Sequence, residues 1–291
     1  MTGPVVLPRS LDAAVAALRD DPDALVIAGG TDLMVEINAG RRRPSTVVSL
    51  THVPELRGWR RDGGELVLGA GLTYAEMERG ELAGLVPALA QAARTVGSPQ
   101  IRNAATLGGN LGTASPAGDT LPVLAALDAT VELADADGTR AVALLDFLTG
   151  VKRTALRPGE LVTGVRVPVL RGPQEFLKVG TRNAMVISVV MVAVLADLDG
   201  RTVRAGLGSV APTPVRAREA EAYAAAHVDW ATTTVTAPDV PRRFGQLCAE
   251  ATSPIDDHRS TAAYRRHAAA VCAGRALARA FSPDHGIGAT A

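Results

Sequence analysis

The sequence predicts an α+β protein of two domains, at 1–171 and 172–291. A length of 291 residues fits two domains of about 100–200 residues each. In the first domain, short helical and strand patterns alternate around two glycine-rich segments, at 28–33 and 106–112. After Arg171-Gly-Pro173, strand patterns come first and alanine-rich helical patterns follow, which is typical of a separate α+β domain.

Helix signals in the first domain come from capping residues and prolines. Ser10 precedes a helical pattern, and we expect its side chain to cap that helix. Pro87 is suited to the first turn of a helix over 87–96. Asp119 is placed to cap a further helix over 120–127.

Strand candidates are short apolar runs bounded by turn residues. Asp137-Gly138 and Asp199-Gly200 each separate two such runs, and Asp-Gly is a strong signal for a hairpin. We expect residues 24–27 to form a buried strand that leads into the first glycine segment. The other candidates lie at 47–50, 66–68, 130–133, 140–144, 175–179, 187–195 and 202–207.

Alanine-rich patterns with helical spacing end the second domain. They lie at 215–227 and at about 260–280. The closing residues, 282–291, are expected to be frayed. The second domain is therefore predicted to place its strands first and its helices last.

Charge and composition exclude several classes of protein. Lys plus Arg equals Asp plus Glu at 30 each, so no basic excess is available for a nucleic-acid backbone. Only two cysteines are present, Cys248 and Cys272, whereas an iron–sulfur cluster or a structural zinc site takes about four ligands. The five histidines are scattered without metal-site spacing. We therefore expect this chain to bind neither nucleic acid nor a metal.

The N-terminal residues and the apolar stretches of the sequence predict a soluble, cytoplasmic protein. Residues 1–10 lack the cationic leader and apolar core of a signal peptide. The longest apolar stretch, 185–196, is shorter than the ~20 residues that a membrane-spanning helix needs. We expect no membrane span.

The two glycine-rich segments carry the clearest functional signal. Glycine permits a positive φ and a close approach of the backbone to a ligand, and successive exposed amides form a concave nest for anionic oxygens. A single Gly-Gly turn is more often purely structural, but two of them could hold a diphosphate from two sides. Thr31 and Asn110 add side chains able to hydrogen-bond phosphate oxygens. Neither segment has the Gly-x-Gly-x-x-Gly pattern and no Walker lysine is present, so ordinary NAD and ATP motifs are absent.

Five motifs, in order along the chain, resemble those of one family. They are Ala-Gly-Gly-Thr-Asp-Leu at 28–33, Thr-Leu-Gly-Gly-Asn at 106–110, Ala-Ser-Pro-Ala-Gly-Asp at 114–119, Phe-Leu-Lys-Val-Gly-Thr-Arg at 176–182 and Asp-His-Arg-Ser-Thr-Ala-Ala-Tyr-Arg at 257–265. With them the chain resembles the FAD-binding (medium) subunit of molybdenum hydroxylases, in the xanthine dehydrogenase and carbon monoxide dehydrogenase family. The resemblance covers about residues 3–280.

The resemblance implies a fold and a set of cofactor contacts. The fold is a vanillyl-alcohol-oxidase (PCMH) type FAD-binding domain of two α/β subdomains, followed by a small α+β C-terminal domain with a three-stranded antiparallel sheet and helices. FAD is expected to bind without a covalent link, because Thr31-Asp32 stands where covalent relatives carry a histidine. The residues expected to bind FAD are Val26, Ile27, Ala28, Gly29, Gly30, Thr31, Asp32, Leu33, Val96, Thr106, Leu107, Gly108, Gly109, Asn110, Asp119, Val162 and Lys178.

The resemblance gives these residues different roles. The two glycine segments should hold the pyrophosphate through backbone amides, and Val96 and Val162 should make apolar contacts with the flavin. Asp119 is expected to contact ribityl or ribose hydroxyls, to cap its helix, or both. Lys178, one of only two lysines, is expected near the flavin N1–C2 edge, where a cation stabilises reduced, anionic flavin.

The implied function is electron transfer rather than substrate oxidation. FAD would take electrons from a two-iron two-sulfur cluster on a small iron–sulfur subunit and pass them to a soluble acceptor. Substrate would be oxidised at a molybdenum cofactor on a large molybdopterin subunit of a heterotrimeric complex, so we assign no catalytic residue to this chain. NAD-using relatives carry acidic residues after the lysine motif, where this chain has Arg182-Asn-Ala-Met185, so NAD is not specified as the acceptor. Two alternatives are a free-standing flavin reductase of the same fold and a flavin-free assembly module.

Overall fold

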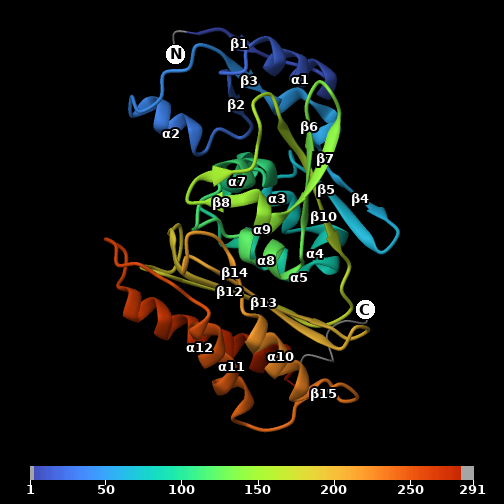
Figure 1. Cartoon of the computed structure of the whole chain (residues 1–291), viewed down its shortest axis with the longest axis vertical. Helices are drawn as coiled ribbons and strands as arrows, with labels where there is room; N and C mark the ends of the chain where they lie inside the picture. Colours follow the sequence, from blue (N-terminus) through green and yellow to red (C-terminus); the bar gives the residue numbers. More distant parts are fainter. Residues whose placement is uncertain (1–2, 283–291) are drawn as a thin grey trace. The chain divides into compact units, whose positions relative to one another are not determined.

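A computed structural model of the chain describes residues 3–282 and divides them between two compact units (Figure 1). Unit 1 contains Met1–Met77, Ser98–Ser115 and Asp128–Pro168, and unit 2 contains Glu78–Gly97, Pro116–Leu127 and Val169–Ala291. Neither unit is continuous in sequence, because two helical segments from before residue 128 pack with the C-terminal part of the chain. The domain boundary at 171/172 stays a prediction.

Unit 1 begins with a three-stranded parallel sheet. Its order is β1 (Val5–Val6), β3 (Val47–Ser49) and β2 (Leu25–Ile27), accompanied by α2 (Leu33–Asn38), η1 (Leu50–His52) and η2 (Pro54–Leu56). Helix α1 (Leu11–Asp20) is capped as predicted, because the Ser10 side chain accepts a hydrogen bond from the amide of Ala13. The strand predicted at 24–27 exists as β2, but the prediction that it is buried was wrong. It lies at an edge of this small sheet, and Val26 is 37% exposed.

The larger sheet of unit 1 is antiparallel and five-stranded. Its strands are labelled in Figure 1. Its order is β4 (Trp59–Asp62), β5 (Glu65–Gly69), β10 (Leu161–Pro168), β6 (Thr130–Ala134) and β7 (Thr139–Ala143). Asp137-Gly138 forms the predicted turn between β6 and β7, and Oδ1 of Asp135 accepts hydrogen bonds from both turn amides. The central strand β10 was not predicted. Gly164 and Arg166 interrupt its apolar run, and its register shifts between Val162 and Gly164.

Short helices and a small hairpin complete unit 1. They are α3 (Tyr74–Met77), α6 (Pro99–Ala104), α7 (Leu107–Thr113), α9 (Leu144–Phe147), β8 (Leu148–Gly150) and β9 (Arg153–Thr154). The second glycine segment was predicted to contain a Gly-Gly turn, and this was wrong, because residues Leu107–Thr113 form α7. The hydroxyl of Thr106 caps this helix by accepting the amide of Gly109 at 3.1 Å. Such a cap offsets part of the low helix propensity of glycine.

Unit 2 is built on an antiparallel sheet whose strands follow one another in sequence. They are β11 (Gln174–Gly180), β12 (Ser188–Asp197), β13 (Thr202–Gly208) and β14 (Val215–Arg216). The three long strands and the hairpin turn at Asp199-Gly200 are as predicted, whereas the two-residue β14 was not predicted. Every residue of β12 before Asp197 is buried, so this strand is covered on both faces.

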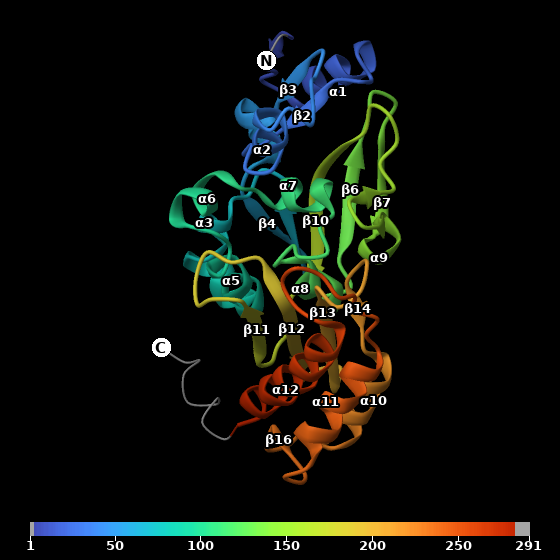
Figure 2. The same ribbon diagram turned by 90° about the vertical axis from the view of Figure 1, so that its left-hand side faces the viewer.

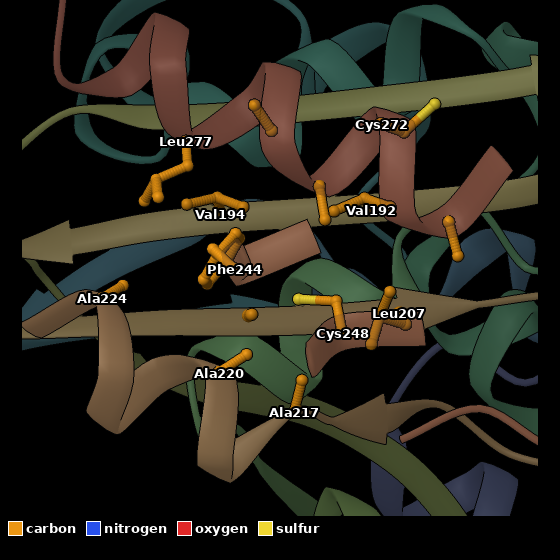
Figure 3. Close-up of a cluster of buried hydrophobic side chains, with 14 of the residues drawn as sticks. Val192, Val194, Leu207, Ala217, Ala220, Ala224, Phe244, Cys248, Cys272 and Leu277 are labelled. Atoms are coloured by element: carbon orange, nitrogen blue, oxygen red, sulfur yellow. The ribbon is translucent and has the colours of Figure 1, made fainter. Parts of the chain in front are cut away.

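Helices cover both faces of the unit 2 sheet (Figures 1 and 2). On one face lie α10 (Arg218–Ala226), α11 (Val240–Glu250) and α12 (Ala262–Ala280). Figure 3 shows the core that they share with the sheet, where Val194 lies near Phe244 and Leu277 and Val192 lies on the side of Cys272. The other face is covered by α5 (Pro87–Arg94) and α8 (Leu121–Ala126), with α4 (Gly80–Leu85) next to α5.

Most helices predicted for unit 2 are confirmed, with shifted ends. The helix expected over 215–227 begins only at Arg218, because residues 215–216 pair as β14. Helix α11 was not predicted, and no side chain caps its start. A small hairpin, β15 (Val228–Asp229) and β16 (Thr234–Val235), lies between α10 and α11. Of the segment predicted to be frayed, residues 283–291 lie outside the described part of the chain.

Candidate functional site

The first glycine segment connects β2 to α2 and lies against the end of α6. Gly30 has a φ of +71°, a conformation that favours glycine. A Cβ on Gly29 would stand 1.8 Å from the carbonyl oxygen of Ala104, so the backbone of Gly29 lies directly on the backbone of α6. The backbone conformation at Gly30 and the close contact at Gly29 therefore both disfavour any residue with a Cβ.

Three successive amides of this segment are available to a ligand. Within the described residues, the amides of Gly29, Gly30 and Thr31 donate to no protein acceptor. The next helix begins without a side-chain cap, since Asp32 makes no capping hydrogen bond. A run of unbonded amides around a residue with positive φ forms a nest for anionic oxygens. This segment is suited to bind one phosphate group or a similar anion.

The second glycine segment offers a different surface. Its amides are already used: those of Leu107 and Gly108 donate to Leu72 and Ala70 at 2.9 and 2.7 Å. The amides of Gly109 and Asn110 donate to the hydroxyl and carbonyl oxygens of Thr106. A ligand that approaches α7 therefore meets side chains and glycine Cα atoms, or else shares an amide that already has an acceptor. The prediction that these residues contact a pyrophosphate stays a prediction.

The two glycine segments lie together in unit 1. The hydroxyl of Thr113, at the end of α7, donates to Oδ2 of Asp32 at 3.2 Å. The close approach of Gly29 to Ala104 gives a second connection, because Ala104 is only two residues before the cap of α7. The Asp32 carboxylate is thus held by a hydroxyl of α7. Neither Thr113 nor Ala104 was predicted, and no sequence signal marks contacts between segments so far apart.

A second group of predicted residues lies in unit 2. Nζ of Lys178, on β11, is 2.6 Å from Oδ2 of Asp119, and their side chains are only 7% and 6% exposed. Nζ also donates to the carbonyl oxygen of Thr95 at 3.1 Å, and the Thr95 hydroxyl donates to Oδ2 of Asp119 at 3.3 Å. The other carboxylate oxygen, Oδ1, is buried without a hydrogen-bond partner. Burial raises the pKa of Asp119, while Lys178 and Thr95 act in the opposite direction.

This arrangement corrects one expectation about Asp119. It does not cap α8: the residue at the helix cap is Thr120, and no side chain makes the capping hydrogen bond. The Asp119 carboxylate is instead taken by Lys178, 59 residues away in the sequence. The role of Thr95 was not predicted, because its contacts are set by folding and leave no pattern in the sequence.

The remaining predicted residues divide between the units. Val162 is 8% exposed on β10 in unit 1, and Val96 follows α5 in unit 2.

Metal-binding clusters and membrane-spanning helices are absent from the described part of the chain. No group of His, Cys, Asp and Glu side chains able to hold a metal ion occurs among residues 3–282. Across the same described residues, no helix is long and apolar enough to cross a membrane.

Two family models match the chain in sequence order. The family described as "FAD binding domain in molybdopterin dehydrogenase" matches residues 2–170, and the family described as "CO dehydrogenase flavoprotein C-terminal domain" matches residues 175–280. The fold and the matched domains define a flavoprotein subunit of an oxidoreductase. More specifically, the chain belongs to the FAD-binding medium subunits of molybdopterin dehydrogenases, the family of carbon monoxide and xanthine dehydrogenases.

Individual relatives match over most of their length. The carbon monoxide dehydrogenase medium chain of Afipia carboxidovorans is 31% identical over 279 residues, which is 94% of either chain. The nicotinate dehydrogenase FAD-subunit of Eubacterium barkeri is 37% identical over 227 residues, 74% of this chain and 76% of that protein. The glyceraldehyde dehydrogenase medium chain of Sulfolobus acidocaldarius is 30% identical over 92% of this chain and 95% of its own length.

Solved structures agree with the fold. A structure of Cu,Mo-CO dehydrogenase superposes with a TM-score of 0.86 at 29% identity, covering 97% of this chain and 99% of the other. Quinoline 2-oxidoreductase from Pseudomonas putida 86 gives a TM-score of 0.87 at 27% identity, covering 97% of each chain. The predicted fold class, an FAD-binding domain followed by a small α+β domain, is therefore confirmed.

Proposed function

We propose that this chain binds FAD without a covalent bond and transfers electrons from an iron–sulfur partner subunit to a soluble acceptor. The observation that carries the proposal is the run of unbonded amides at Gly29, Gly30 and Thr31 in a family of FAD-binding subunits. An anionic diphosphate is the part of FAD that such a nest fits. FAD supplies the redox chemistry, and this chain binds it, orients it and adjusts its electrostatic surroundings.

Non-covalent binding is supported by the residues of the first glycine segment. No histidine or cysteine lies at 28–33, and the Asp32 carboxylate is occupied by the Thr113 hydroxyl. The proposed FAD contacts are those predicted from sequence, from Val26 to Lys178. In unit 1, the unbonded amides of Gly29, Gly30 and Thr31 support a contact with the diphosphate. In unit 2, the buried pair of Lys178 and Asp119 supports a polar contact. The other contacts are proposed from the resemblance alone.

The proposed partners are a small subunit with two-iron two-sulfur clusters and a large subunit with the molybdenum cofactor. Several relatives are called medium chain or FAD-subunit, names that describe one part of a larger enzyme. The two cysteines of this chain, Cys248 and Cys272, are buried in the hydrophobic core of unit 2, so we assign the clusters to a partner. We further propose that the complex is heterotrimeric and works in the cytoplasm.

The first test is FAD binding by the purified chain, measured by its absorbance spectrum and by titration of the apoprotein. Gly30→Ala should weaken FAD binding at least tenfold, because a Cβ at this φ strains the nest. Gly40→Ala is the matched control: its φ is +69° and nothing lies within 4 Å of the added Cβ. Equal FAD affinity in the two variants, or a colourless wild-type protein that takes up no FAD, would overturn the proposal.

The second test separates the electron-transfer role from a flavin reductase. The chain should be co-expressed with candidate iron–sulfur and molybdopterin subunits and analysed by size-exclusion chromatography. Co-elution of the three chains, with FAD reduction only in their presence, is expected. Steady-state turnover of an organic substrate by the isolated chain would instead favour the reductase.

A further inference from the structure

Lys178 is not an isolated cation. Its Nζ lies 2.6 Å from Oδ2 of Asp119, and both side chains are more than nine-tenths buried. At that separation, and with little water to screen either group, the carboxylate cancels most of the field of the ammonium at longer range. The expected role of Lys178, a cation that favours reduced flavin, is therefore incomplete without Asp119.

The position of Lys178 is fixed from three parts of unit 2. The lysine is on β11, Asp119 precedes α8, and Thr95 follows α5. The ammonium donates to Asp119 Oδ2 and to the Thr95 carbonyl oxygen, which leaves its third N–H for another acceptor. The single proton of the Thr95 hydroxyl is shared between Asp119 Oδ2 and the carbonyl oxygen of Ala92, which is the nearer acceptor at 2.8 Å and anchors Thr95 to the end of α5. The ammonium and carboxylate groups are thus held as a pair.

We propose that Asp119 is a positioning residue that acts through Lys178, lowering the reduction potential of bound FAD by neutralising the lysine. The inference rests on the proposed function, in which FAD is bound and contacts Lys178. Reduction of FAD adds negative charge, and a nearby cation stabilises that state. A carboxylate paired with the cation removes much of this stabilisation. The pair then sets a lower potential than an unpaired lysine would.

The test is the reduction potential of FAD bound to the full chain, measured by equilibration with redox dyes. Asp119→Asn keeps the size and an acceptor oxygen of the side chain but removes its charge. This variant should shift the equilibrium toward reduced FAD by at least tenfold, about 30 mV for a two-electron couple. The double variant Asp119→Asn/Lys178→Met has no charge at either position. Its potential should return toward that of the wild type, whose pair is also neutral overall.

A matched control is available in the same unit. Glu221 and Arg216 form another buried pair, with 2.6 Å between Glu221 Oε1 and Arg216 Nε. Glu221→Gln removes a buried negative charge from a residue that we do not place at the cofactor. It should lower the stability of the protein and leave the potential of FAD unchanged.

Several results would overturn the inference. An unchanged potential in Asp119→Asn would mean that the carboxyl group is already neutral. Equal potentials in the single and double variants would mean that Asp119 does not act through Lys178. Loss of FAD from Asp119→Asn would make the carboxylate a required ligand, and an equal shift in Glu221→Gln would make the effect non-specific. In all four cases the wild type still binds FAD, whereas a wild type that binds none removes the proposed function itself.

Discussion

The hydroxyl of Thr113 donates a hydrogen bond to Oδ2 of Asp32 across 81 residues of sequence, with 3.2 Å between the two oxygens. This contact joins the end of α7 to the residue at the start of α2. A free carboxylate beside a phosphate nest would repel the anion. The hydrogen bond from Thr113 instead holds the Asp32 carboxylate on a hydroxyl donor. The neighbouring amides of Gly29, Gly30 and Thr31 donate to no protein acceptor, so they remain available to the anion.

Thr113→Val should therefore weaken FAD binding more than it weakens the fold. The substitution keeps the shape of the side chain but removes the donor, so Asp32 is released toward the proposed diphosphate. We expect FAD affinity to fall several-fold and the free energy of unfolding to fall by about 1 kcal/mol, the usual value of one hydrogen bond. Titration with FAD and urea denaturation of the apoprotein measure the two effects. Unchanged FAD affinity would show that the contact has no part in cofactor binding.

Gly29→Ala should destabilise unit 1, and Gly112→Ala should stabilise it. The Cβ of the first variant would lie 1.8 Å from the carbonyl oxygen of Ala104, so the segment must move away from α6. Overpacking of this kind costs about 1–3 kcal/mol. Nothing lies within 4 Å of a Cβ at Gly112, which is inside α7, so alanine gains roughly 0.5–1 kcal/mol from helix propensity. Urea denaturation of both variants checks the sign, and equal stabilities would contradict the packing of Gly29 on α6.

Local signals predicted much of this fold, and contacts distant in sequence explain most of the differences. The Ser10 cap and the turns at Asp137 and Asp199 depend on neighbouring residues alone, so the sequence was sufficient for them. Asp119 has the same local pattern as a capping residue, yet its carboxylate binds a lysine 59 residues away. The pairing partner of Asp119, and therefore its role, exists only after folding has brought Lys178 of β11 to the segment before α8.

The glycine segments illustrate the same limit. Their composition predicted a site for an anion, and the free amides at 29–31 support that interpretation. The composition did not show that the second segment is a capped helix rather than a nest, because a threonine before two glycines is compatible with both structures. Strand β10 was missed for a related reason: its pairing with β5 and β6 stabilises a run that contains Gly164 and Arg166.

Acid should destabilise unit 2 through Asp257. Burial alone raises the pKa of this carboxyl group, but hydrogen bonds from Arg259, Arg265 and the amide of Ser260 outweigh it and lower the pKa well below its usual range. A carboxyl group with a lowered pKa in the folded state stabilises the protein above its unfolded pKa of about 3.9, and this contribution is lost as the pH falls further. The free energy of unfolding should therefore decline below about pH 4, and less steeply in Asp257→Asn. Parallel pH profiles for the two proteins would contradict this assignment.

Glu221→Ala should be among the most destabilising substitutions in unit 2. Its carboxylate accepts hydrogen bonds from Arg216 Nε at 2.6 Å and Nη2 at 2.9 Å, and from the amide of Ala205 at 2.8 Å. Both side chains of the pair are more than nine-tenths buried. Removing one partner of a buried ion pair costs about 3–5 kcal/mol, because the remaining guanidinium loses the carboxylate that compensates its burial. Replacing both partners by apolar residues of similar size, as in Arg216→Met/Glu221→Leu, should cost clearly less. Urea denaturation of the two variants decides the point: if the double variant is the less stable of the two, the loss of Glu221 from the buried guanidinium is not the source of the destabilisation.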